Sequence, residues 1–253
     1  AKDVSKKLQA KLSGADEAKV TKSATTNPEA YQAYLKGRYL WNRRTADNLK
    51  KAIEQFKAAA DRDPNYALAF AGLADCYVIL NDYSATPLSE TLPQATAYAE
   101  RAIAIDPQLA EPYAAIGAAH QYLWRWAEAE REFKRAIELN PNYATAFHWY
   151  CNLLEDLGRF DEAELMIRRA QEIDPLSSII SMNVSIIYQL QNDHDASVEN
   201  SLKLIGLDPY FSGAYRMLGL SYLKQGRHVE AIANLEKAVD LSDRVGRALP
   251  DLG

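Results

Sequence analysis

The chain has 253 residues, of which 48% are hydrophobic and 25% are charged, a composition typical of a folded protein. Its net charge of −5 at pH 7 weighs against nonspecific binding to nucleic acid or to an anionic membrane surface. No apolar run is long enough to span a bilayer, and no signal peptide stands at the start. We therefore expect no nucleic-acid partner, no direct membrane insertion and a cytoplasmic location, with the periplasm as the alternative.

Residues 1–27 are predicted to form a short amphipathic helix followed by a linker. Val4, Leu8 and Leu12 fall on one helical stripe with lysines around it. Gly14 interrupts this pattern, and residues 15–27 are polar and rich in Ala, Thr and Lys.

The next segment places cations beside aromatic rings. Lys36, Arg38, Arg43 and Arg44 are interleaved with Tyr39 and Trp41. Such a segment is typical of a solvated helix face, and it also suits an anion or a single-stranded nucleic acid. The sequence favours the solvated face, because acidic residues elsewhere outnumber these cations.

A proline recurs every 34 residues through the rest of the chain, at Pro107, Pro141, Pro175 and Pro209. Such a fixed period is characteristic of stacked repeats. Pro64 precedes Pro107 by 43 residues, which places a nine-residue insertion within 81–94. We expect the insertion to lengthen a turn or the second helix of its repeat and to narrow any groove beside it.

Each repeat is predicted to be a pair of helices. With the proline as position 32, small residues recur at positions 8, 20 and 27, where they let two helices approach closely; position 20 is Ala52, Ala95, Ala129, Ala163, Ser197 and Ala231. In one repeat, helical periodicity covers 144–157 and 160–173, and Gly158 and Pro175 end the two helices. The fold class is therefore all-α, an α-solenoid. The unit 178–211 departs most from the pattern, so we expect looser packing or a local bend there.

These positions resemble the tetratricopeptide repeat (TPR), a unit of two antiparallel helices. The resemblance covers about 31–253, with full units near 67–109, 110–143, 144–177, 178–211 and 212–245 and an atypical unit at about 31–64. It implies a right-handed superhelix over 28–253, with about six repeats and the start of a seventh in 246–253. It also implies a non-catalytic scaffold that binds a protein or peptide in its concave groove.

The order of the amino-terminal segment and the repeats resembles the carboxyl-terminal arrays of bacterial multidomain signalling proteins that carry a TolB-amino-terminal-like domain. In those proteins a winged-helix regulator, a Ser/Thr kinase or a nucleotide cyclase can precede the array. The alternative function is therefore a regulatory or self-associating module, which would contact the parent chain or another copy.

No motif for catalysis, a cofactor or a metal is present in the sequence. Cys76 and Cys151 lie in different repeats without metal-ligand spacing and are expected to be small buried residues. Trp124 and Trp126 stand at a turn where this repeat usually has glycine. Both either pack between helices or form an exposed aromatic anchor for a partner.

The resemblance places the first helix of each repeat along the groove, with His148, Asn152, Asn183 and Arg216 among the residues facing it. Asn152 and Asn183 match the two asparagines with which some TPR proteins hold a peptide carboxylate, but the cations of that clamp are missing or displaced. Amides can still pair with an extended peptide backbone. Arg216 adds one cation, so we expect an acidic or carboxylate-bearing segment as ligand.

Overall fold

The computed structural model describes residues 25–242 of the chain. This part contains twelve α-helices in six antiparallel hairpins and no strand. The helices are α3 (Pro28–Asn42), α4 (Ala46–Arg62), α5 (Ala67–Tyr83), α6 (Leu88–Ile105), α7 (Glu111–Tyr122), α8 (Trp126–Leu139), α9 (Ala144–Asp156), α10 (Phe160–Ile173), α11 (Ser178–Leu190), α12 (His194–Leu207), α13 (Ser212–Lys224) and α14 (His228–Leu241). The predicted all-α solenoid is confirmed. The expected helix at 2–12, nearly all of the linker and the seventh repeat lie outside the described residues.

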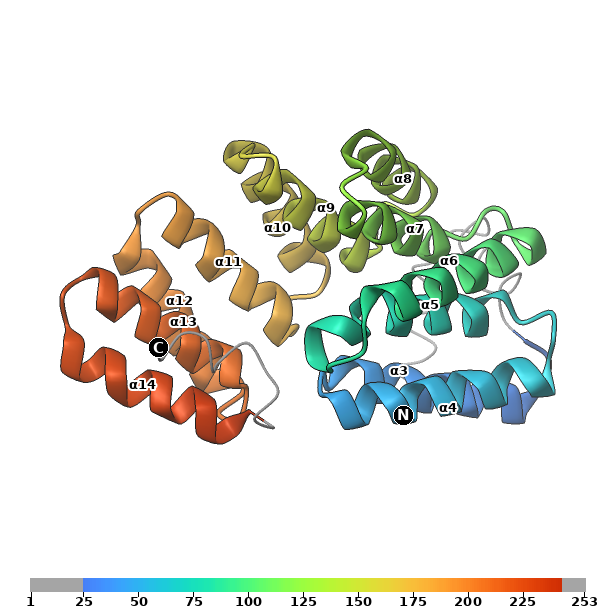
Figure 1. Ribbon diagram of the computed structural model, residues 1–253, viewed down its shortest axis with the longest axis horizontal. Helices are drawn as coiled ribbons and strands as arrows, with labels where there is room; N and C mark the ends of the chain where they lie inside the picture. The colour runs from blue at the N-terminus through green and yellow to red at the C-terminus, as the bar shows by residue number, and fades with distance from the viewer. Residues whose placement is uncertain (1–24, 243–253) are drawn as a thin grey trace, which may run out of the picture.

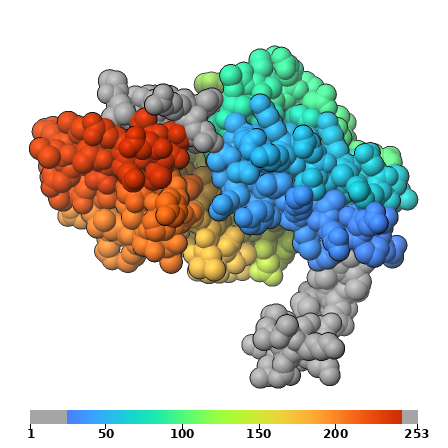
Figure 2. Space-filling view, turned by 90° about the horizontal axis from the view of Figure 1, so that it is seen from below, coloured from blue at the N-terminus to red at the C-terminus, as the bar shows by residue number. Residues whose placement is uncertain are grey.

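The hairpins follow one another along an arc (Figure 1), from α3 and α4 through α7 and α8 to α13 and α14. Seen from below, the first and last described hairpins lie on opposite sides of the molecule (Figure 2). Each second helix packs on its own first helix and on the first helix of the next repeat, as a one-dimensional array requires.

Five of the six hairpin turns in the described residues, all but the α5–α6 turn, use a left-handed residue to reverse the chain. Gly158 and Gly226 have φ of 72° and 76°, which glycine adopts without a steric penalty. Asn192 takes the same conformation, and so do Arg44 and Trp124, with φ of 50° and 61°. Asparagine tolerates this region, but a bulky tryptophan is strained there.

Small residues sit where helices touch, as predicted. Ala129 and Ala163 are completely buried, and so are the alanines at position 27, which are Ala59, Ala102, Ala136, Ala170 and Ala238. Large side chains pack against these small residues inside the hairpins. A methyl group added at Gly117 would lie only 3.0 Å from the ring of Phe133, so this glycine permits the close approach of α7 and α8.

Replacing Ala163 with leucine is expected to lower the free energy of unfolding by about 1–3 kcal/mol, because the site has no room for three more carbons. Urea denaturation followed by circular dichroism measures the change. Ala127→Leu on α8 is the matched control, since Ala127 is exposed. Equal stability of the Ala163 variant and the parent would contradict the packing described above.

Polar side chains fill the core of the divergent repeat, for which the sequence predicts looser packing or a local bend. Four serines, Ser185, Ser197, Ser201 and Ser221, are completely buried between α11, α12 and α13. Ser185 and Ser201 are hydrogen-bonded at 3.1 Å, and Ser221 donates to Ser197 at 2.8 Å. Gln189 Nε2 also donates to Ser221 at 2.9 Å. Hydrogen bonds between these buried polar side chains thus take the place of apolar contacts made in the other repeats.

The insertion lengthens both helices of its hairpin. The helices α5 and α6 have 17 and 18 residues, against 13 and 14 in α9 and α10. A longer second helix was one of the two predicted alternatives, whereas the longer first helix was not predicted. The extra carboxyl-terminal turns of α5 carry Asp82 along the inner face of the arc, toward α7 and α9.

Candidate peptide-binding cavity

A cavity of about 540 Å³ opens on the inner face, between α5, α7, α9 and α11. The lining comprises the end of α5, the start of α6, the end of α7, the α7–α8 turn, the start of α8 and residues of α9 and α11. Its side chains are Val78, Ile79, Asp82, Leu88, Ala118, Gln121, Tyr122, Trp124, Trp126, Trp149, Asn152, Glu155, Asp156, Asn183 and Ile186. Its size suits a short peptide segment, and its walls combine apolar surface with a few polar groups, as binding sites commonly do.

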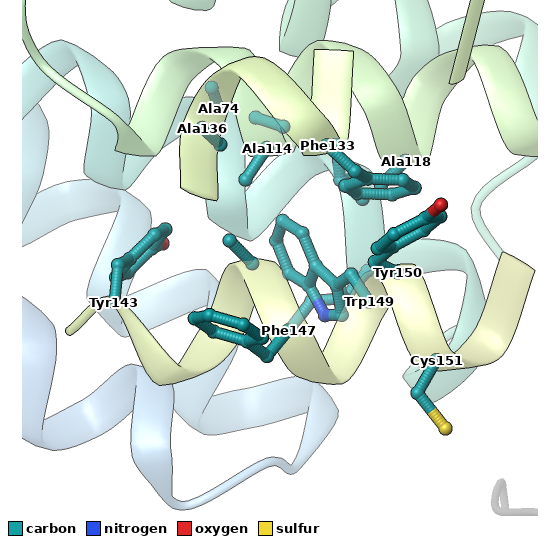
Figure 3. Packing of buried hydrophobic residues seen from close by; sticks show 14 of the residues in the cluster. Ala74, Ala114, Ala118, Phe133, Ala136, Tyr143, Phe147, Trp149, Tyr150 and Cys151 are labelled. Carbon is teal, nitrogen blue, oxygen red and sulfur yellow. The ribbon is translucent and has the colours of Figure 1, made fainter. Parts of the chain in front are cut away.

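Trp149 forms the floor of the cavity and ties it to the core. Its indole extends from α9 toward Ala114 and Ala118 of α7, beside the stacked rings of Phe133 and Tyr150 (Figure 3). The side chain is nearly completely buried. This wall is therefore preorganised by packing and needs no rearrangement to receive a ligand.

Trp124 forms the rim. It lies in the α7–α8 turn, and 76% of its surface is exposed, although its ring contacts that of Trp126 with 5.3 Å between centroids. Trp126 packs against the core, which is the first of the two alternatives that the sequence left open for Trp124 and Trp126. Trp124 does not: it combines an exposed aromatic surface with a left-handed backbone, and strain of this kind is typical of functional positions.

Two of the four residues singled out in the sequence meet in the cavity. Asn183 on α11 donates from Nδ2 to Oδ1 of Asn152 on α9 at 2.8 Å. This bond uses one donor and one acceptor, and an amide has two donors and a carbonyl oxygen with two lone pairs. The pair therefore keeps hydrogen-bonding capacity for a peptide backbone.

The other two residues lie elsewhere. His148 is buried in α9 and is not part of the cavity wall. Arg216 is on α13, also outside the lining. The structure thus brings Asn152 and Asn183 together in the cavity, and neither His148 nor Arg216 is among its lining residues.

Carboxylates are the charged groups of the cavity. Glu155 accepts a hydrogen bond from the thiol of Cys151 at 3.2 Å, and burial raises the pKa of Glu155 to about 7. Asp156 accepts from Gln121 Nε2 at 2.7 Å, which links α9 to α7. Asp82, on α5, also lines the cavity. Cys151 and Cys76 are both buried, as expected, and neither forms a disulfide bond.

Toward the first repeats the inner face is closed by its own side chains. Arg38 on α3 forms an ion pair with the fully buried Asp75 on α5 at 2.8 Å, and the Tyr143 hydroxyl contacts the same carboxylate at 3.5 Å. Trp41 on α3 meets Trp149 on α9 with 6.5 Å between ring centroids. We call Arg38, Asp75, Glu111 and Tyr143 the inner junction.

The inner junction corrects the interpretation of the basic segment. Arg38 pairs with Asp75, and Arg44 stacks on the buried Trp41 with its guanidinium carbon 3.6 Å from the ring centroid. Neither cation belongs to a solvated face or to an anion-binding surface. Lys36 and Arg43 are exposed, as expected for that face.

Sequence reasoning missed Asp82 and Glu155 as parts of the site. The insertion was a usable signal, because a longer α5 extends the wall on which Asp82 lies. No single repeat indicated that the site is acidic, because Asp82 comes from α5 and the other two carboxylates from α9, which are far apart in the sequence.

Three family profiles described as tetratricopeptide repeat match residues 34–86, 125–181 and 212–244, more than half of the chain together. The chain therefore belongs to the tetratricopeptide repeat proteins. This agrees with the paired helices and the small residues at their contacts. No helix among residues 25–242 has the length and apolar character needed to cross a membrane.

Solved structures share this fold at low sequence identity. Human IFIT1, in a structure with Gppp-AAAA, is 16% identical with a TM-score of 0.72, and the match covers 88% of this chain and 53% of IFIT1. A chain of the APC/C hetero-tetramer Cut9–Hcn1 is 16% identical with a TM-score of 0.65, covering 88% of this chain and 46% of its own. MamA from Desulfovibrio magneticus is 18% identical with a TM-score of 0.51, over 68% and 94%. The chain thus spans about half the length of the first two.

Replacing Trp124 with glycine is expected to raise the free energy of unfolding by about 1 kcal/mol, because glycine adopts the left-handed conformation without the penalty that tryptophan incurs. Urea denaturation of the two proteins measures the change. The matched control is Arg125→Gly, since Arg125 has an ordinary φ of −92° and gains nothing from glycine. A less stable Trp124 variant would show that the ring contributes more through packing than its backbone costs.

Proposed function

We propose that this chain is a non-catalytic scaffold that holds a short segment of a partner protein in the cavity between α5, α7, α9 and α11. The observation that carries the proposal is the joint presence of a preorganised tryptophan floor, a strained and exposed tryptophan rim and a paired amide within one concavity. Aromatic anchors supply binding energy, and amides recognise peptide backbone without dictating its sequence.

A protein ligand fits this cavity better than a nucleic acid. Carboxylates repel a polyanion, whereas nucleic-acid sites gather cations around phosphates. Three carboxylates line the cavity, and none of the described lining residues is basic.

Selection of short random peptides displayed on phage, with the whole chain as bait, tests the proposal. Binding of the selected peptides is expected to weaken by roughly 0.5–1.5 kcal/mol in Asn152→Ala and in Asn183→Ala, the contribution of one hydrogen bond. Circular dichroism should show unchanged helical content. Asn65→Ala, an exposed asparagine between α4 and α5, is the control. If no peptides are selected, or if both cavity variants bind them as tightly as the parent, the cavity is not the binding site.

A second candidate function is a regulatory or self-associating module of a larger bacterial signalling protein. Val229 and Ile232 on α14 are exposed to 80% and 55%, an apolar surface that another copy would cover. Sedimentation velocity over a range of concentrations tests this candidate. A mass that rises with concentration in the parent and stays constant in Ile232→Glu supports it, and a constant monomer mass in both rejects it.

A further inference from the structure

We propose that the cavity selects a basic side chain, lysine or arginine, of the bound segment. The inference rests on the proposed function and deepens it by naming the chemistry of the ligand. It differs from the sequence-based expectation of an acidic ligand, which depended on Arg216, a residue outside the cavity wall.

The first argument is the charge of the lining. Asp82 comes from α5, whereas Glu155 and Asp156 come from α9, so carboxylates of two helices line the cavity. Among the fifteen described residues of the lining, none is a lysine, arginine or histidine. A cation that enters this space is attracted by the carboxylates of both helices, whereas a carboxylate of the ligand would be repelled by them.

The second argument is the aromatic wall. Tyr122, Trp124 and Trp126 border the same space as the carboxylates, with Trp149 below them. A cation within about 6 Å of an aromatic ring is attracted by its negative face, and tryptophan binds cations best. The molecule already uses this contact internally, since the guanidinium carbon of Arg44 lies 3.6 Å from the ring centroid of Trp41.

The third argument is hydrogen-bonding capacity. An ionised carboxylate offers about four lone-pair sites. Asp156 uses one of these sites for Gln121. Glu155 uses one for the Cys151 thiol; burial raises the pKa of Glu155 to about 7, and a cation bound beside it favours the ionised form. An ammonium group with three donors, or a guanidinium with five, can therefore be satisfied without breaking either contact.

The experiment compares the whole chain with Trp124→Gly as bait for short random peptides displayed on phage. Peptides that bind the parent but not the variant report on the cavity. Lysine or arginine should recur at one position of these peptides. Cavity-dependent peptides with an acidic or apolar residue at that position would overturn the inference and leave the proposed function standing. Peptides indifferent to Trp124, or none at all, would overturn both.

A selected peptide is then measured by calorimetry with lysine at its basic position or with norleucine there, which keeps the four side-chain carbons of lysine and removes the charge. The replacement is expected to lower affinity about tenfold. In the double variant Glu155→Gln, Asp156→Asn the parent peptide should lose a similar factor and the norleucine peptide almost none. The control is Asp161→Asn, an exposed aspartate of the same hairpin, which should change neither affinity. Equal affinity of the two peptides for the parent chain would show that the charge is not recognised.

Discussion

Replacing Arg38 with alanine is expected to lower the free energy of unfolding by about 3–5 kcal/mol, because it leaves the carboxylate of Asp75 buried without its cation. Burial raises the pKa of Asp75 to about 6, even though Arg38 lowers it. Without the arginine that pKa rises further, and the side chain can take up a proton instead of staying charged. The destabilisation should therefore be larger at about pH 8 than at about pH 5.

Urea denaturation at the two pH values measures the effect. Asp75→Asn in the Arg38→Ala background should restore part of the loss, because it removes the orphaned charge. Lys36→Ala is the matched control, an exposed cation on the same helix. A loss in Arg38→Ala no greater than in Lys36→Ala would mean that the inner junction does not hold α3 against α5.

The stability of the chain should fall as the pH rises from about 4.5 to about 7, and Glu111 should account for much of this fall. Burial raises the pKa of Glu111 to about 7, and Asp75 raises it further while Arg38 opposes the change. Its Oε2 atom is buried and has no hydrogen-bond partner among the described residues. In the folded state the carboxyl therefore keeps its proton over a pH range in which the unfolded chain has lost it.

The sign follows from this difference in proton binding. Where the folded state binds more protons than the unfolded state, the free energy of unfolding decreases with increasing pH. A shift from 4.5 to about 7 corresponds to on the order of 3 kcal/mol, complete above the folded-state pKa. Asp75 and Glu155, whose pKa values burial also raises, act in the same direction.

Glu111→Gln removes the titration while keeping the shape of the side chain. The variant should show a flatter dependence of unfolding free energy on pH and should exceed the parent in stability at about pH 8. Glu54→Gln, an exposed glutamate on α4, serves as the control. Parallel curves for the parent and Glu111→Gln would show that Glu111 does not titrate abnormally in the folded chain.

The repeating hairpins were predictable from the sequence because the interactions that create them are local. Gly158 ends α9, and Ala163 lies where α10 meets its neighbours, so the proline period and the small residues place these contacts without knowledge of distant segments. Asn152 and Asn183 were predictable as neighbours for the same reason, since equivalent helices of adjacent repeats lie side by side. The unit 178–211 indicated a change of packing, but only the structure shows that its Ser185 bonds to Ser201 and its Ser197 to Ser221 of the next repeat.

The tertiary structure alone decided which surface of the array is open and what charge it has. The curvature of the arc is the sum of small rotations between repeats, and it brings Trp41 of the first described hairpin against Trp149 of the fourth. The two tryptophans fill one part of the inner face, where Arg38 pairs with the buried Asp75. The cavity begins at Trp149, which lines it. Asp82 and Glu155 line the same cavity because α5 is longer than its counterparts, and no pattern within a single repeat encodes that arrangement.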